Sequence, residues 1–136
     1  MIRQYSLVRD GNRRLTPDFK VRELRCKDGT DTVMVDETLT VVLQCIREHF
    51  GKAVVITSGY RTTAHNAKVG GAKSSQHLLG RAADIRVQGV RVEDVAAYAE
   101  SLMPDWGGVG RYPVKVGRAT GWVHVDTRAE KARWRG

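Results

Sequence analysis

The spacing of hydrophobic residues predicts two amphipathic helices. Between Asp36 and Phe50, hydrophobic residues recur every three or four positions, as they do on one face of a helix. Asp36 is a typical N-cap, and Gly51 is a typical helix stop. The same spacing from about Val92 to Met103 predicts a second helix, which Pro104 ends.

Shorter stretches rich in β-branched or alternating residues have the pattern of strands. Two candidates alternate, Ala82–Val87 and Gly121–Thr127. Their aliphatic residues share one face, and the other face carries Asp84 in the first and Trp122, His124 and Asp126 in the second. The predicted strands are Ala53–Thr57, Ala82–Val87, Gly108–Tyr112 and Gly121–Thr127.

Mixed helices and strands, with an antiparallel hairpin near the end, place the chain in the α+β class. We expect one small domain over residues 1–136, with a mostly antiparallel sheet packed against two main helices. Residues 1–25 are predicted to be an irregular N-terminal segment, and short extended pieces are expected at Phe19–Glu23 and Thr32–Val35. Residues 129–136 are dense in Lys and Arg and are predicted to be a frayed basic tail.

Composition and charge restrict the possible partners of the chain more than they restrict its fold. A net charge of +8 suits an anionic polymer, such as nucleic acid, an acidic membrane or a cell wall, or serves solubility alone. Aromatic residues are not interleaved with the basic ones, and no zinc-finger or helix-turn-helix spacing occurs, so no nucleic acid partner is expected. The two cysteines, Cys26 and Cys45, do not favour a bridge, although their pairing stays open.

No hydrophobic run has the length of a membrane span, and the first residues lack the hydrophobic region of a signal peptide. We therefore expect a chain that has no membrane span and is cytoplasmic as synthesised. We also expect it to be a monomer. If it acts outside the cell, it must be released by another route.

Three residues stand out for chemistry: His77, Asp84 and His124. Two imidazoles and one carboxylate form a complete protein ligand set for a catalytic zinc, with a fourth position left for water. The glycines in Gly107–Gly110 lack the Lys-Ser/Thr of a phosphate loop, and they fit a close approach of the backbone to a metal site or substrate.

The string SSQHLLGRAAD fits the SxHxxGxAxD motif of the zinc D-Ala-D-Ala carboxypeptidase family at every fixed position, namely Ser75, His77, Gly80, Ala82 and Asp84. His124 in GWVHVD follows in the family's order. The chain resembles this family from Cys26 to Arg128, most of all its short phage and prophage members. The resemblance implies a hedgehog-like fold, one zinc ion per chain, and hydrolysis of peptidoglycan stem peptides by an endolysin-type enzyme released through a holin or on lysis.

The resemblance also assigns substrate-binding residues. Arg61, in SGYR, matches an arginine that grips the terminal carboxylate of the substrate, a task that suits a guanidinium. Ser75 is expected to hydrogen-bond the substrate or a ligand. Tyr112 is a candidate for the wall of the cleft, or for a packing role.

The general base is where the chain departs from the family. Related enzymes carry an acidic residue three positions before the last histidine ligand, and this chain has Gly121 there. Asp126 is the best substitute, because it shares a face with His124, and Asp105, before the Gly107–Gly108 turn, is a weaker candidate. Asp126 could equally orient His124 or pair with a surface cation.

Three alternatives remain open. A carboxypeptidase and an endopeptidase would share all of these residues. A catalytically inactive wall-binding or phage structural protein of the same fold would explain the missing acid at Gly121. A non-haem iron oxygenase would also use two histidines and a carboxylate, but it needs more strands than this pattern predicts.

Overall fold

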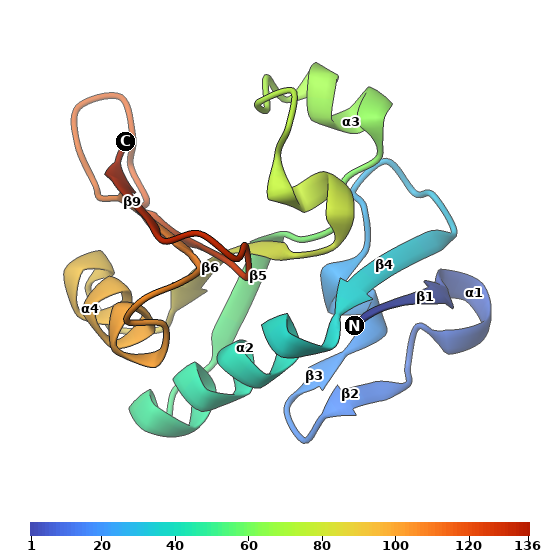
Figure 1. Cartoon of the computed structure of the whole chain (residues 1–136), viewed down its shortest axis with the longest axis horizontal. Helices are drawn as coiled ribbons and strands as arrows, with labels where there is room; N and C mark the ends of the chain where they lie inside the picture. Colours follow the sequence, from blue (N-terminus) through green and yellow to red (C-terminus); the bar gives the residue numbers. More distant parts are fainter.

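The hydrophobic faces of two helices and a five-stranded sheet meet in one core. The computed structural model describes residues 1–136 (Figure 1). Its elements are β1 (Ile2–Ser6), α1 (Leu7–Asp10), β2 (Arg14–Thr16), β3 (Phe19–Lys20), η1 (Val21–Leu24), β4 (Thr32–Asp36), α2 (Glu37–Phe50), β5 (Val54–Ser58), α3 (Thr63–Lys68), η2 (Gln76–Leu79), β6 (Ala82–Val87), α4 (Val92–Leu102), β7 (Gly108–Tyr112), β8 (Trp122–Asp126) and β9 (Ala132–Arg135).

The main sheet has the strand order β5-β6-β8-β7-β9. Neighbouring strands are antiparallel, except that β9 runs parallel to β7. The α+β class, the mostly antiparallel sheet and the terminal β7–β8 hairpin are therefore confirmed.

Helices α2 and α4 cover one face of this sheet (Figure 1). The strands contribute alternating apolar residues to that face, so polar residues of β6 and β8 are left on the opposite face. The core between the layers includes Leu43 and Ile46 of α2, Val95 and Ala99 of α4, and Ile56, Ile85, Val109, Val123 and Val125 of the sheet.

Helix α2 forms as its sequence predicts. The Asp36 side chain accepts a hydrogen bond from the Thr38 backbone N–H, and Gly51 adopts a left-handed conformation with φ 62° at the C-cap. Helix α4 ends at Leu102, one residue before its predicted end.

The segment over residues 1–25 is more regular than predicted: β3 falls on the expected extended piece at Phe19, but β1, α1, β2 and η1 were not expected. Strand β1 pairs antiparallel with β4, from Ile2 opposite Asp36 to Ser6 opposite Thr32. Phe19 and Leu24 are 1% exposed and belong to the core. The sequence gives little signal for β1 and β2, because both strands are short and mostly polar. Strand β1 gains its stability from a partner about thirty residues away.

The prediction of a frayed tail over residues 129–136 is wrong. Strand β9 is the edge strand of the main sheet, with Gly110 of β7 opposite Trp134. Its first residues are held by a hydrogen bond from the Ala132 N–H to the Gly107 carbonyl.

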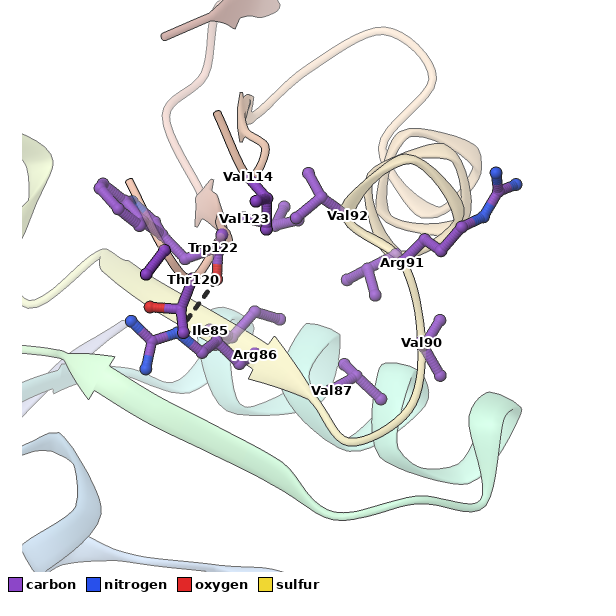
Figure 2. A pocket seen from close by; sticks show the side chains of 13 residues that line it. Ile85, Arg86, Val87, Val90, Arg91, Val92, Val114, Thr120, Trp122 and Val123 are labelled. Carbon is purple, nitrogen blue, oxygen red and sulfur yellow. Dashed lines mark hydrogen bonds between the residues drawn. The ribbon is translucent and has the colours of Figure 1, made fainter. Parts of the chain in front are cut away.

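Cys26 and Cys45 are both free thiols. No helix combines the length and the apolar character needed to cross a membrane. A mainly apolar cavity of about 290 Å³ opens at one end of the core, beside the start of α4, where Val87, Val92 and Val114 line it (Figure 2).

Candidate metal centre

One row of paired residues crosses the whole main sheet. Ser58 pairs with Asp84, Asp84 with His124, His124 with Gly110, and Gly110 with Trp134. Residues paired in this way present their side chains on the same face of a sheet. The row therefore brings a hydroxyl, a carboxylate, an imidazole and an indole together on the face that α2 and α4 leave uncovered.

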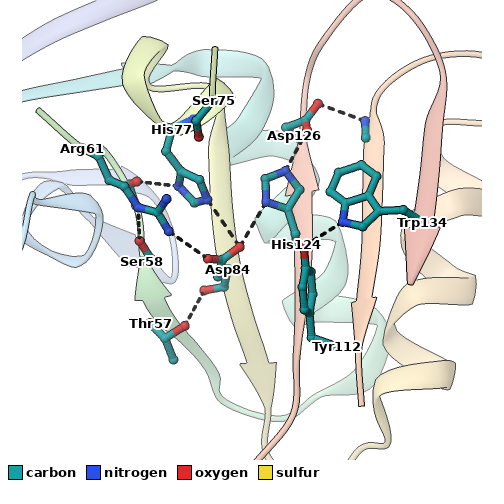
Figure 3. Close-up of polar contacts among 12 residues, drawn as sticks. Thr57, Ser58, Arg61, Ser75, His77, Asp84, Tyr112, His124, Asp126 and Trp134 are labelled. Carbon is teal, nitrogen blue, oxygen red and sulfur yellow. Dashed lines mark hydrogen bonds and ion pairs between the residues drawn. The ribbon is translucent and has the colours of Figure 1, made fainter. Parts of the chain in front are cut away.

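The loop before β6 adds His77 to this row. One ligand atom from each of His77, Asp84 and His124 lies within 4.8 Å of the other two. His77 Nε2 is 3.4 Å and His124 Nδ1 is 3.1 Å from the same oxygen, Asp84 Oδ1 (Figure 3). All three residues are buried. The structure thus brings the three predicted ligands to one point.

Local structure fixes His77. It lies in η2, where Ser75 is the N-cap and its Oγ accepts a hydrogen bond from the His77 N–H. Its Nδ1 is 2.7 Å from the Gly59 carbonyl oxygen, which can only accept, so Nδ1 carries the proton. The Nε2 lone pair is therefore directed toward Asp84 and His124.

Asp126 holds the His124 ring through its Nε2 atom. Asp126 Oδ2 is 2.7 Å from His124 Nε2, and the carboxylate also accepts hydrogen bonds from the Gly108 N–H and from Nε and Nη2 of Arg128. A Cβ on Gly108 would lie 2.2 Å from Asp126 Oδ2, so only glycine leaves room for this carboxylate. Nε2 therefore donates to Asp126, and Nδ1 is the nitrogen free to bind a metal.

This placement does not agree with the prediction that Asp126 is the general base. The residue is 0% exposed and does not line the cavity in front of the ligands. Its geometry fits the alternative role, in which a carboxylate fixes the tautomer and orientation of a histidine ligand.

Charges around the site favour a cation. Burial raises the pKa of Asp84, but hydrogen bonds from His124 and His77 outweigh it, so the net pKa lies well below its usual range. Burial lowers the pKa of His124, and hydrogen bonds to Asp126 and Asp84 reverse that effect, so the net pKa is raised. The same carboxylates would stabilise a metal cation in place of the proton on Nδ1.

The donor set fits zinc. Two imidazole nitrogens and one carboxylate oxygen converge, and each imidazole has its other nitrogen held by an acceptor, as metal-binding histidines do. A zinc ion would be held by His77 Nε2, Asp84 and His124 Nδ1.

Arg61 lies beside the ligand carboxylate. Its Nη2 is 3.4 Å from Asp84 Oδ2, and Nε donates to Ser58 Oγ at 3.0 Å (Figure 3). Its Nη1 donates to Asn66 Oδ1 at 3.2 Å. These contacts hold the guanidinium in one place at the edge of the metal centre, where it can bind a substrate carboxylate.

These side chains surround one cavity of about 460 Å³. Arg61, Ser75 and Tyr112, which were predicted to contact substrate, all line it. The complete lining is Arg61, Val69, Gly70, Gly71, Ala72, Ser74, Ser75, Gln76, His77, Asp84, Tyr112, Trp122, His124, Arg128 and Trp134.

Two of the lining residues, Arg128 and Trp134, were not singled out from the sequence. The Trp134 ring lies 5.0 Å from the His124 ring, and the Arg128 guanidinium lies 5.3 Å from the Trp134 ring centre. The only available signal was a lone tryptophan alternating with arginines in Arg133–Arg135, which is the pattern of a strand with one polar face.

Comparison with known proteins finds a matching family and related peptidases. The family described as Peptidase M15 matches residues 14–126. The chain is similar to a probable peptidoglycan L,D-endopeptidase MepK of Haemophilus influenzae, with 38% identity over 88 residues, which is 61% of this chain and 43% of the relative. It is also similar to peptidoglycan L,D-endopeptidase MepK of Escherichia coli, with 35% identity over 81 residues, 56% of this chain and 41% of the relative. The chain spans less than half the length of these curated relatives.

Proposed function

Since this chain belongs to the Peptidase M15 family, we propose that it is a zinc-dependent peptidase that hydrolyses a peptide bond in the stem peptides of peptidoglycan. The observation that carries the proposal is the convergence of His77, Asp84 and His124 at the wall of an open cavity. The names of the relatives support peptidoglycan as the substrate.

The side chains of the cavity suit such a reaction. Zinc bound to this donor set would polarise the scissile carbonyl and lower the pKa of a bound water to about 7. Arg61 would bind a carboxylate of the substrate and so fix the peptide relative to the ligands. Asp126 would keep the His124 ring in its binding orientation.

The names of the relatives and the position of Arg61 support different bonds of the stem peptide as the one that is cut. Both relatives are named as L,D-endopeptidases, which supports cleavage inside the stem peptide or its cross-links. Arg61 supports recognition of a free carboxylate, which a D-Ala-D-Ala carboxypeptidase requires at the chain end. We favour the endopeptidase, because it has the support of related proteins, and keep the carboxypeptidase as the alternative.

Mass spectrometry of peptidoglycan fragments tests the proposal. Purified peptidoglycan is incubated with the zinc-loaded protein, with the same protein plus chelator, and with His77→Ala. We expect new stem-peptide products only with the zinc-loaded wild type. Loss of a terminal D-Ala would identify a carboxypeptidase, and shortened or separated stem peptides would identify an endopeptidase.

A binding module without catalysis is the second candidate. The observation in its favour is that Asp84 is the only acidic residue lining the cavity, so no separate carboxylate stands ready as a base. Under this candidate the zinc-loaded protein would sediment with insoluble peptidoglycan but release no products.

An endolysin-type role, with release by a holin or on lysis, is a further part of our proposal. It is tested by adding the protein to intact cells and to cells with a permeabilised outer layer. Lysis restricted to the second sample would support a requirement for release to the wall.

A further inference from the structure

The hydroxyl proton of Tyr112 has no hydrogen-bond acceptor within the protein. Trp134 Nε1 lies 2.8 Å from Tyr112 Oη. An indole N–H can only donate, so Tyr112 Oη is the acceptor in this bond, and its own hydrogen must point elsewhere. Tyr112 Oη makes no other hydrogen bond within the protein. Because Tyr112 lines the cavity, its proton is available to a group bound there.

The Tyr112 ring is held in place by three neighbours: Trp122, Arg118 and the end of the chain. It stacks on Trp122, with ring centres 4.7 Å apart and planes 7° from parallel. The guanidinium of Arg118 lies 5.3 Å from the Tyr112 ring centre and 4.8 Å from that of Trp122. A Cβ on Gly136 would lie 2.2 Å from the Tyr112 ring, so the end of the chain also confines it. The hydroxyl is thus a preorganised donor, which costs little to reorient during a reaction.

Trp134 links this hydroxyl to the metal centre. Its ring lies 5.0 Å from the ring of His124 and occupies the space above Gly110, where a Cβ would approach the indole to 2.5 Å. Gly110 is the paired residue of both His124 and Trp134 across the sheet. Figure 3 shows Tyr112, Trp134 and His124 grouped on the same side of the site.

We propose that Tyr112 is a catalytic residue whose hydroxyl donates a hydrogen bond to the carbonyl oxygen of the scissile bond, and that Trp134 is the positioning residue for that hydroxyl. This inference rests on the proposed peptidase function. It assigns a catalytic task to the C-terminal strand β9, which carries Trp134.

The chemistry follows from where charge develops. When a peptide carbonyl is attacked, negative charge grows on its oxygen, and a fixed donor near that oxygen stabilises the transition state more than the substrate. Tyr112 keeps its proton throughout, so its role as a donor adds no proton transfer to the reaction. Because Tyr112 Oη already accepts the indole N–H, its own O–H becomes a stronger donor.

Steady-state kinetics on a peptidoglycan fragment test the inference, with the zinc content of every variant measured. Tyr112→Phe keeps the stacked ring and removes only the hydroxyl. We expect kcat to fall on the order of 100-fold, the usual effect of losing one such donor, while KM and zinc content stay near wild type. Tyr98→Phe is the matched control, because Tyr98 stacks on His49 between α2 and α4 and does not line the cavity.

Trp134→Phe separates positioning from packing, because it keeps an aromatic ring but lacks the N–H. We expect a smaller fall in kcat, and no further fall when the change is added to Tyr112→Phe, because the two groups act through one hydrogen bond. An equal fall in both backgrounds would overturn the positioning role of Trp134.

The outcomes also distinguish the inference from the proposed function. An active wild type with an equally active Tyr112→Phe would overturn the inference alone, as would a variant that loses zinc or changes only in KM. A zinc-loaded wild type that hydrolyses no peptidoglycan would overturn the proposed function and, with it, this inference.

Discussion

Each histidine of the candidate metal centre has one nitrogen hydrogen-bonded to the protein and one that could bind a metal. In His77 the hydrogen-bonded nitrogen is Nδ1, which donates to the Gly59 carbonyl, and in His124 it is Nε2, which donates to Asp126. The two partners differ, since a backbone carbonyl cannot be removed by mutation and the Asp126 carboxylate can. Asp126 is therefore the residue through which metal affinity can be tested without changing a ligand.

We expect Asp126→Asn to weaken zinc binding by about 10- to 100-fold while turnover largely recovers at saturating zinc, the usual effect of losing a group that orients a ligand. Competition with a chelator gives the affinity, and kinetics over a zinc series give the turnover. Asp105→Asn, at an exposed acid outside the cavity, is the control. Turnover that stays two to four decades low at saturating zinc would restore the role of general base.

Arg61 gives a second prediction at this scale. Arg61→Ala should weaken binding of substrates with a free carboxylate by about 1.5–3 kcal/mol, the effect of a lost charged hydrogen bond. Because Arg61 also contacts Asp84, zinc content must be measured in the same samples. Comparison with an amidated substrate checks the cause: if the variant loses as much on the amide, Arg61 does not bind the carboxylate.

The candidate ligands and Asp126 show which features of the site can be predicted from the sequence. The convergence of His77, Asp84 and His124 was predictable, because a motif links His77 to Asp84 and strand alternation puts Asp84 and His124 on polar faces. Alternation also put Asp126 on the face of His124, but it could not show that the carboxylate turns toward Nε2. That direction depends on the space above Gly108 and on the Gly108 N–H, which lie 18 residues away in the chain, together with the side chain of Arg128, two residues beyond Asp126.

At the scale of elements, the predictions succeeded where the signal is local. Helix α2 carries its N-cap, its apolar stripe and its terminal glycine within sixteen residues. Strands β1 and β9 have no such signal, since both are short, polar edge strands whose stability comes from distant partners. Trp134 was not predicted in the site because β9, the strand that carries it, was not predicted.

An ion-pair cluster joins α4 to the sheet and makes stability depend on pH. Arg111 of β7 donates two hydrogen bonds to Glu100 of α4, at 2.8 and 2.9 Å, and Arg133 of β9 lies 3.4 Å from the same carboxylate. The hydrogen bonds from Arg111 lower the pKa of Glu100 below its ordinary value of 4.5. A carboxyl with a lowered pKa in the folded state stabilises the fold above its unfolded pKa and loses that contribution as the pH falls.

We therefore expect Glu100→Gln to lower the free energy of unfolding by about 1 kcal/mol at pH 7, the upper range for a partly exposed pair with good geometry. The difference from wild type should shrink as the pH falls below 4.5. Urea unfolding at neutral and acidic pH measures it, with Glu130→Gln as a control at an exposed acid. An equal difference at both pH values would show that the loss is one of packing and not of charge.

At the scale of the whole molecule, positive charge gathers on the segments that build the cavity. Residues 61–91 and 111–136 hold thirteen of the 23 Lys and Arg residues and three of the 15 Asp and Glu residues. Every residue that lines the cavity belongs to one of these two segments. Two of the three acids, Asp84 and Asp126, are buried, so the surface around the cavity is more positive than the net charge of the chain suggests.

This arrangement predicts that salt acts on the approach of an anionic wall polymer rather than on the chemical step. The Debye length falls from about 10 Å at 0.1 M salt to about 3 Å at 1 M, so attraction between exposed charges is largely screened over that range. We expect kcat/KM on intact peptidoglycan to fall steadily with salt, while kcat/KM on a short, uncharged stem-peptide analogue changes little. Parallel losses on both substrates would place the effect of salt in the catalytic centre or in the stability of the fold. Losses confined to the polymer would show that the basic surface around the cavity draws the enzyme to its substrate.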